Sequence, residues 1–231
     1  MSKNSVQKLK SRLKQHIQYA LPSRWPPILC ASMGRSGSTL VFNAVRRGQA
    51  KARFHSDDRL PLQLVTSDAW RPSQVNFHQG VVYKTHAPAG EMPATFGGKV
   101  VFVFGLPSEA ALSVLRCREV LGESWIKTHF FHLASLGTIS DLTEWDVLGY
   151  ERQIVSWRES NAGPRIMIRY ESLWEKQPEL EAFLGFPVSL PPKRIRSSID
   201  AMDPVINAKV QRTFAELDAW VDTLPKCQVL N

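Results

Sequence analysis

Apolar and polar positions follow two different periods along the chain, and the switches between them mark the expected elements. Residues 27–32 form a short apolar run, a polar glycine-rich stretch follows, and residues 40–45 place apolar side chains at helical spacing. This order predicts a buried strand, a tight loop and a helix N-terminus.

The rest of the pattern predicts further strands and helices. Runs of β-branched and aromatic residues predict strands at residues 80–84, 99–104 and 165–170. Helices are expected at residues 108–121, 140–161 with a break near Gly149, 180–184 and 204–221. Periodicity is weak in residues 51–79, which predict one helix at 60–69 between loops, and residues 122–145 are expected to be largely irregular. Strands that alternate with helices predict a parallel sheet with helices on both faces.

The N-terminal segment is basic and amphipathic. Residues 5–21 place apolar side chains at helical spacing among lysines and arginines, so residues 1–22 are expected to form a helix ahead of one domain, residues 23–231. Packing of this helix on the domain is the simpler interpretation. Peripheral contact with an anionic membrane or polymer is the alternative.

Composition narrows the class of protein. The net charge of +8 predicts an anionic partner without separating a nucleotide from a polyanion or a membrane surface. Three distant cysteines, with no C-x-x-C pair, argue against a disulfide framework or a structural zinc site and are typical of a reducing compartment. No apolar run approaches the ~20 residues that cross a bilayer, and no signal peptide opens the chain. A soluble, cytoplasmic protein is expected.

The loop that follows the first strand has the chemistry of an anion site. Its glycines allow a sharp turn and a close approach of the backbone to a ligand. Unpaired N–H groups at the start of the helix favour an anion. The residues expected to hold the anion are Arg35, Ser36, Gly37, Ser38 and Thr39. The stretch does not match the nucleotide-kinase signature, because no Gly-Lys pair is present.

A second group of candidate residues follows the strand at 80–84. Side chains alternate along a strand, so Lys84 and His86 should project to the same face. An imidazole with an ordinary pKa near ~6.5 can accept a proton, and an ammonium group can neutralise charge on a transferred group. Both segments, and residues 105–108, follow strands, so they should meet in one cleft at the carboxyl edge of the sheet.

Together these residues resemble the sulfotransferases that use 3′-phosphoadenosine 5′-phosphosulfate (PAPS). Gly34 to Thr39 looks like the 5′-phosphosulfate loop of that family, and Lys84 to Pro88 is similar to its Lys-Thr-His-x-Pro segment. Val100 to Leu115 resembles the strand and helix that bind the 3′-phosphate, with Ser113 at the family's serine position. Ile168 to Leu173 resembles a strand end at which Tyr170 lies near the adenine, and Glu181 to Pro187 resembles the helix that follows.

The resemblance implies a fold and an activity. The fold is an α/β, three-layer P-loop fold with a central parallel sheet flanked by helices. The activity is transfer of a sulfuryl group from PAPS, without a metal, to a hydroxyl or amine of a small-molecule, lipid or saccharide acceptor. His86 is then the catalytic base, and Lys84 and Arg35 stabilise charge on the sulfuryl and leaving phosphate oxygens.

One position departs from the family pattern. Gly105 stands where the family has the arginine that binds the 3′-phosphate. Arg116 lies one helical turn after Ser113 and is a candidate substitute, as are Arg194 and Arg196 in a later basic loop.

Two other classes remain open at this stage. One is a P-loop nucleotide kinase or hydrolase, which the missing Gly-Lys pair disfavours. The other is a non-catalytic module that binds an anion or polyanion, suggested by the net charge, although nucleic acid is not expected as a partner. The seven tryptophans are scattered, so packing is their expected role.

The acceptor has two conflicting sets of candidate residues. An apolar pocket for a lipid, phenol or small alcohol is expected from Phe77, Trp125, Phe130 and Phe131. A site for an anionic saccharide is the alternative, from Arg53, Arg59 and Arg71.

Overall fold

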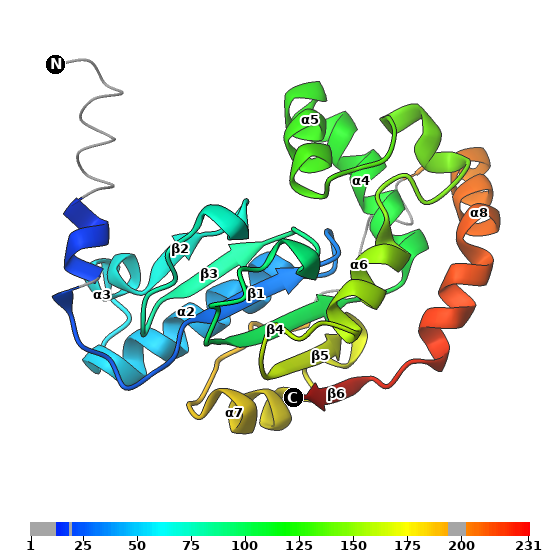
Figure 1. Ribbon diagram of the computed structural model, residues 1–231. Helices are drawn as coiled ribbons and strands as arrows, with labels where there is room; N and C mark the ends of the chain where they lie inside the picture. The colour runs from blue at the N-terminus through cyan, green and yellow to red at the C-terminus, as the bar shows by residue number, and fades with distance from the viewer. Residues whose placement is uncertain (1–12, 19, 194–201) are drawn as a thin grey trace, which may run out of the picture.

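A six-stranded sheet forms the centre of the molecule (Figure 1). The computed structural model describes residues 13–18, 20–193 and 202–231. The strands are β1 (Ile28–Ser32), β2 (Thr66–Asp68), β3 (Val82–Thr85), β4 (Lys99–Phe104), β5 (Arg165–Arg169) and β6 (Cys227–Leu230). Their order in the sheet is β2-β3-β1-β4-β5-β6; the pairs from β2 to β5 are parallel, and β6 pairs antiparallel with β5.

Helices cover both faces of this sheet. The α-helices are α2 (Ser38–Phe54), α3 (Arg59–Leu64), α4 (Pro107–Leu121), α5 (Glu123–His132), α6 (Tyr150–Arg158), α7 (Gln177–Leu184) and α8 (Pro204–Thr223). Short 3₁₀ turns are η1 (Pro72–Gln74), η2 (Ala89–Glu91), η3 (Ile139–Thr143) and η4 (Tyr170–Ser172).

Alternate residues of the central strands pack into two separate cores. On β1, Ile28 and Cys30 belong to a core with α2 and α7, whereas Leu29 and Ala31 belong to a larger core with α4, α5, α6 and α8. The same alternation occurs on β4, where Val101 faces the first core. A strand buried on both faces has to be apolar along its whole length, as β1 and β4 are. The predicted three-layer α/β fold is therefore confirmed, with one antiparallel strand at its edge.

Most predicted elements are present, and the errors fall at short or irregular segments. The strand at 99–104 and the helices near 108–121 and 204–221 are confirmed. The helix predicted at 60–69 is wrong beyond Leu64, because residues 66–68 form β2. Residues 122–145 are not irregular, since they contain α5 and η3. Of the helix predicted at 140–161, residues 139–143 are a 3₁₀ turn and α6 covers only 150–158. The sequence analysis also missed β6.

The described start of the chain is fastened to the domain. Residues 13–18 and residue 20 are helical, while residues 1–12 of the predicted basic helix lie outside the described residues. The buried Gln18 side chain donates to the carbonyls of Leu64 and Thr66, at 2.9 and 3.2 Å. This contact joins residue 18 to the α3–β2 junction, which agrees with packing of the segment on the domain.

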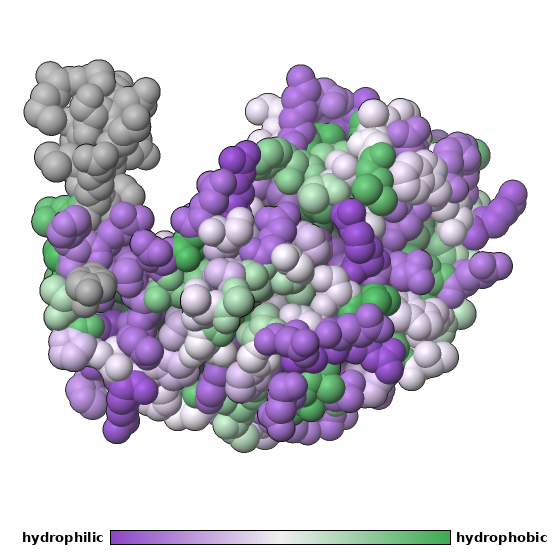
Figure 2. Space-filling view, viewed as in Figure 1, coloured by the Kyte–Doolittle hydropathy of each residue, from purple (hydrophilic) through white to green (hydrophobic). Residues whose placement is uncertain are grey.

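In the part of the chain that the structure describes, no helix is both long and apolar enough to cross a bilayer. Figure 2 shows a largely hydrophilic face, with apolar residues gathered near α5. The exposed apolar side chains of that region include Phe131, Leu136 and Trp145.

Gly48 in α2 provides a test of the packing between α2 and the segment after α7. A Cβ atom at Gly48 would lie 2.4 Å from the Pro187 carbonyl oxygen and 2.9 Å from the Phe186 ring. Alanine favours a helix over glycine by ~1 kcal/mol, but overpacking costs ~1–3 kcal/mol. We expect Gly48→Ala to lower the free energy of unfolding in urea, whereas the control Gly97→Ala, which has open space at its Cβ, should change it little. A Gly48→Ala protein as stable as wild type would contradict this packing.

Candidate active site

A cleft of about 660 Å³ opens at the carboxyl ends of the parallel strands. It is lined by the loop after β1 and the start of α2, the end of β3, one face of α4 and one face of α5. Strand β1 lies between β3 and β4, so the chain places β2 and β3 on one side of β1 and then crosses to place β4 and β5 on the other. Ligands of open α/β sheets bind at such a switch point, as the sequence analysis expected here.

The loop between β1 and α2 turns through left-handed backbone conformations. The φ angles are +86° at Gly34, +50° at Arg35 and +84° at Gly37. A Cβ at Gly37 would lie 2.4 Å from the Tyr170 ring, so only glycine fits there. Among the residues that the structure describes, no side chain caps the N-terminus of α2, and the first turn of α2 contains no acidic residue. The first N–H groups of α2 are thus free of side-chain partners, as an anion site requires.

Arg35 links this loop to the opposite wall of the cleft. Its Nε donates to Ser113 Oγ on α4 at 2.9 Å, and its guanidinium lies 5.7 Å from the centre of the Trp125 ring. Two residues predicted from separate segments of the sequence are therefore in contact. Ser36 differs from its neighbours, because its buried hydroxyl donates to the Val103 carbonyl and does not line the cleft.

Lys84 reaches the same anion site from β3. Its Nζ donates to Thr39 Oγ1 at 2.8 Å, so Thr39, on the first turn of α2, is fixed toward the end of β3. Burial lowers the pKa of Lys84; Asp68 and Cys30 act against this shift and Arg35 adds to it. Lys84 and His86 both line the cleft, whereas the intervening Thr85 is buried and accepts from the Ala87 N–H. The predicted alternation along this strand is confirmed.

His86 is held on the floor of the cleft by hydrogen bonds at both its ring and its backbone. Its Nδ1 lies 2.9 Å from Ser32 Oγ and 3.3 Å from the Ser32 carbonyl oxygen. Because a carbonyl only accepts, this contact favours a proton on Nδ1 and leaves the Nε2 lone pair for the cleft. Gln153 donates to the His86 carbonyl at 2.7 Å. Burial and then the charge of Lys84 lower the pKa of His86 to about 3, so the ring is uncharged at neutral pH.

The α5 wall of the cleft is the part that the sequence analysis missed. Trp125, Thr128, His129 and His132 line the cleft from positions i, i+3, i+4 and i+7 of this helix. The Trp125 and His129 rings stack at 4.7 Å, and His132 stacks at 4.1 Å on Trp70, which follows β2. The helical spacing of these residues is the signal that would have identified α5. Trp70 therefore contributes to the cleft, contrary to the packing role expected of the tryptophans in general, whereas Trp125 lies in the cleft as one of the residues named for an apolar pocket.

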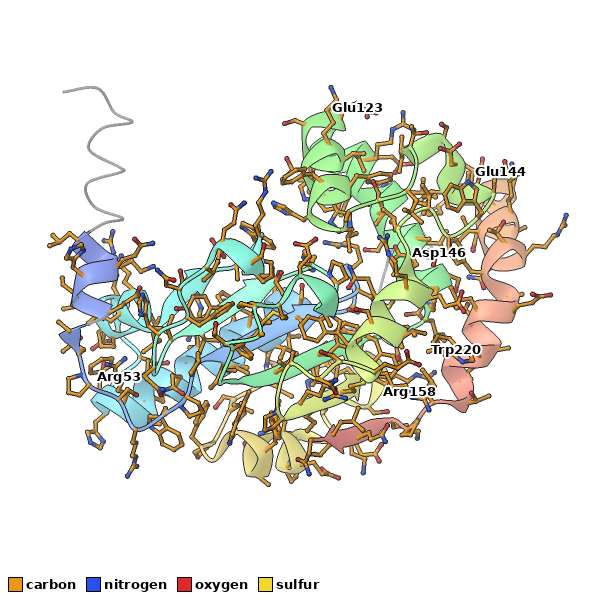
Figure 3. All side chains as sticks on the ribbon, viewed as in Figure 1. Arg53, Glu123, Glu144, Asp146, Arg158 and Trp220 are labelled. Atoms are coloured by element: carbon orange, nitrogen blue, oxygen red, sulfur yellow. The ribbon has the colours of Figure 1, made fainter. Side chains whose placement is uncertain are left out.

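Neither predicted set of acceptor residues forms one surface. Phe130 is buried in the larger core, Phe77 packs on Tyr83 and Phe96, and Phe131 lies below Arg71. Of the four aromatic residues, only Trp125 lines the cleft. Arg53 donates to the carbonyls of residues 21, 22 and 80 and lies at the far end of α2 from the cleft (Figure 3). Arg59 and Arg71 do not line the cleft either.

Gly105 and Arg116 differ in their surroundings and in whether they line the cleft. A Cβ at Gly105 would lie 3.2 Å from Glu171 Oε1, so a carboxylate lies beside this position. Arg116, in contrast, lines the cleft next to Ser113 and pairs with Glu119 at 2.6 Å on its own exposed helix face. Such exposed pairs contribute little to stability, so Arg116 can turn to a ligand at small cost. Arg194 and Arg196 lie outside the described residues.

A second cavity, of about 1100 Å³, adjoins the cleft at Thr39, Leu40 and Tyr170. It runs between α2 and residues 187–192. Tyr170 lines both cavities and covers Gly37. A ligand whose anionic group binds the α2 N-terminus can therefore extend past Tyr170 along α2.

Comparison with solved structures finds sulfotransferase-like proteins. Mouse sulfotransferase SULT7A1 complexed with PAP is 14% identical over 87% of both chains, with a TM-score of 0.46. Retinol dehydratase with androsterone and the inactive cofactor PAP is 16% identical, covering 89% of this chain and 69% of that chain, with a TM-score of 0.45. The same enzyme with retinol and PAP gives a TM-score of 0.46 at 16% identity and the same coverage. No protein-family model and no curated protein sequence matches the chain.

The buried histidines should make stability depend on pH. Burial lowers the pKa of His86 to about 3 and that of His129 well below its ordinary value, while both should titrate near ~6.5 when unfolded. Their stabilising contribution is then full above pH ~6.5 and is lost as the pH falls, by up to ~1.4 kcal/mol per pH unit for each histidine. Urea unfolding between pH 7 and pH 5 should show this decline, and His86→Gln should make it shallower. An unchanged slope in the variant would place the effect elsewhere.

Proposed function

We propose that the protein is a sulfotransferase that uses PAPS and a general base to sulfate a hydroxyl or amine of a small acceptor. The observation that carries this proposal is the convergence of an uncapped helix N-terminus, Arg35, Lys84 and the uncharged His86 on one cleft. Among the described residues that line this cleft, none is acidic. The arrangement suits stabilisation of an anionic group by fixed cations beside a group that can accept a proton.

The anion-binding side of the cleft is preorganised. The first N–H groups of α2, the Arg35 guanidinium and the Lys84 ammonium are the groups that would hold the 5′-phosphosulfate. Arg35 is fixed by Ser113 and Lys84 by Thr39, so little reorganisation is needed when charge develops during transfer. PAPS supplies an activated sulfuryl group, and the chain supplies orientation and charge stabilisation, which dominate the analogous phosphoryl transfers.

His86 takes the proton from the acceptor in this proposal. Its Nδ1 contacts to Ser32 orient the Nε2 lone pair toward the cleft. The positive charges of Lys84 and Arg35 are among the causes that lower its pKa. An anionic donor offsets both charges, so donor binding should raise the pKa of His86 and make it a stronger base at the moment of transfer.

The nucleoside side has room for adenosine, and Arg116 is a suitable cation for a second phosphate. The cavity of about 1100 Å³ beyond Tyr170 would take the adenosine. Glu171 disfavours a phosphate beside Gly105, so we assign the 3′-phosphate to Ser113 and Arg116 on α4. In this assignment Arg116, on α4, binds the 3′-phosphate. The family uses for this an arginine at the end of the preceding strand, where this chain has Gly105.

Calorimetric titration with 3′-phosphoadenosine 5′-phosphate (PAP) and with ADP tests the donor. Wild type should bind PAP more tightly than ADP at moderate salt, and Arg35→Ala should lose PAP binding. Arg116→Ala should weaken PAP at least ~10-fold and ADP much less, since a charge-assisted hydrogen bond contributes ~1.5–3 kcal/mol. Arg118→Ala is the matched control, because Arg118 pairs with Glu123 and does not line the cleft. Equal or absent binding of PAP and ADP to wild type would favour a non-catalytic anion-binding module.

Replacement of His86 tests its role in catalysis separately from the binding of the donor. His86→Ala should lower the turnover of PAPS by ~100-fold or more, measured as PAP released, because general-base catalysis contributes ~10²–10⁴. The affinity for PAP should change little. A parallel loss of PAP affinity would mean that His86 is a structural residue of the cleft.

A further inference from the structure

His129 is a buried polar residue in the cleft wall that the proposed chemistry does not use. Its side chain is 6% exposed, and its Nε2 has no hydrogen-bond partner among the described residues. Buried polar atoms are almost always paired, and an unpaired one costs stability. A buried ring nitrogen without a partner, in the wall of a cleft, therefore points to a ligand that supplies one.

The residues packed around His129 hold its ring in place, but none of those described forms a hydrogen bond with its Nε2. One face stacks on Trp125 at 4.7 Å, and the ring lies edge-on to His86 with centroids 6.0 Å apart. Its Cε1 would lie 3.2 Å from a Cβ at Gly34, so it also borders the anion-binding loop. Phenylalanine would fit these apolar contacts without an unpaired nitrogen, so the histidine is not explained by packing.

The position of His129 relative to the other groups defines its side of the cleft. On the proposed anion side, Arg35 donates to Ser113 and Lys84 donates to Thr39. His129 lies on α5 and contacts the ring of His86, the proposed base, and its Nε2 forms no hydrogen bond to these two pairs. Burial, and then the nearby positive charges and rings, lower the pKa of His129 well below its ordinary value. A neutral imidazole has one N–H donor and one lone pair. Because the single hydroxyl proton of the acceptor goes to His86, the His129 ring would donate its N–H to the hydroxyl oxygen.

We propose that His129 orients the acceptor: a ring nitrogen of His129 hydrogen-bonds the attacking hydroxyl while His86 removes its proton. This inference rests on the proposed sulfotransferase function. The acceptor oxygen forms a bond to sulfur as the bond from sulfur to the 5′-phosphate oxygen breaks, and PAP leaves with that electron pair. The hydroxyl proton moves to His86 Nε2. His129 gains and loses no proton in this step and acts by holding the nucleophile in line.

The test combines kinetics with stability in His129→Phe, His129→Gln and the control Lys127→Gln on the exposed side of α5. PAP release from PAPS is measured with water alone and with 4-nitrophenol, an aliphatic alcohol and an alkyl galactoside. His129→Phe should lower the rate with each nucleophile at least ~10-fold, with PAP affinity and the pH profile set by His86 unchanged. It should also raise the midpoint of thermal unfolding by ~2–4 °C, because an unpaired buried atom is removed. His129→Gln, which can still hydrogen-bond, should recover much of the rate.

The outcomes separate this inference from the proposed function. A wild-type protein that does not bind PAP, or binds it and releases none from PAPS with any nucleophile, would overturn the proposed function and this inference with it. Normal PAP release by His129→Phe, with or without a change in thermal midpoint, would overturn the role of His129 alone. Equal losses in His129→Phe and His129→Gln would mean that the ring packs the cleft and does not hold the acceptor.

Discussion

The left-handed turn between β1 and α2 is the constraint on which the rest of the cleft depends. Positive φ angles at Gly34, Arg35 and Gly37 reverse the chain within a few residues, so α2 begins directly at the carboxyl edge of the sheet. Tyr170 closes on Gly37, leaving no space for a side chain. The turn also sends Arg35 across to Ser113. A side chain at residue 37 would therefore displace this loop, Tyr170 and the start of the second cavity together.

Several residues of the cleft lie in surroundings that lower the stability of the folded protein. Lys84 is half-buried and His86 is buried, so the charged form of each is disfavoured, and His129 leaves a ring nitrogen unpaired among the described residues. Such local costs are common where a ligand completes the interactions. The surrounding cores make them tolerable, because β1 and β4 are buried on both faces and hold the strand ends rigidly.

The parts that were predictable from sequence depend on local signals. The apolar run of β4 and the glycine-rich loop before α2 have patterns that neighbouring residues alone explain. Strands β2 and β6, of three and four residues at the sheet edges, are too short to show alternation, and pairing with a neighbour decides them. In the cleft, Lys84 and His86 follow from the strand period, whereas the contact between Arg35 and Ser113 joins residues 78 apart.

The sequence by itself determined the layered α/β fold, the glycine-rich loop before α2 and the placement of Lys84 and His86 on one face of a strand end, because each rests on residue type and short-range period. Only the tertiary structure decided the α5 side of the cleft. It removed Phe77 and Arg53 from the cleft and brought in His129 from α5, since burial and cross-chain contacts depend on how distant elements pack. It also placed Glu171 beside Gly105 and left Arg116 facing the cleft. The low pKa of His86, about 3, likewise follows mainly from its burial in the folded protein, which the identity of the residue alone does not determine.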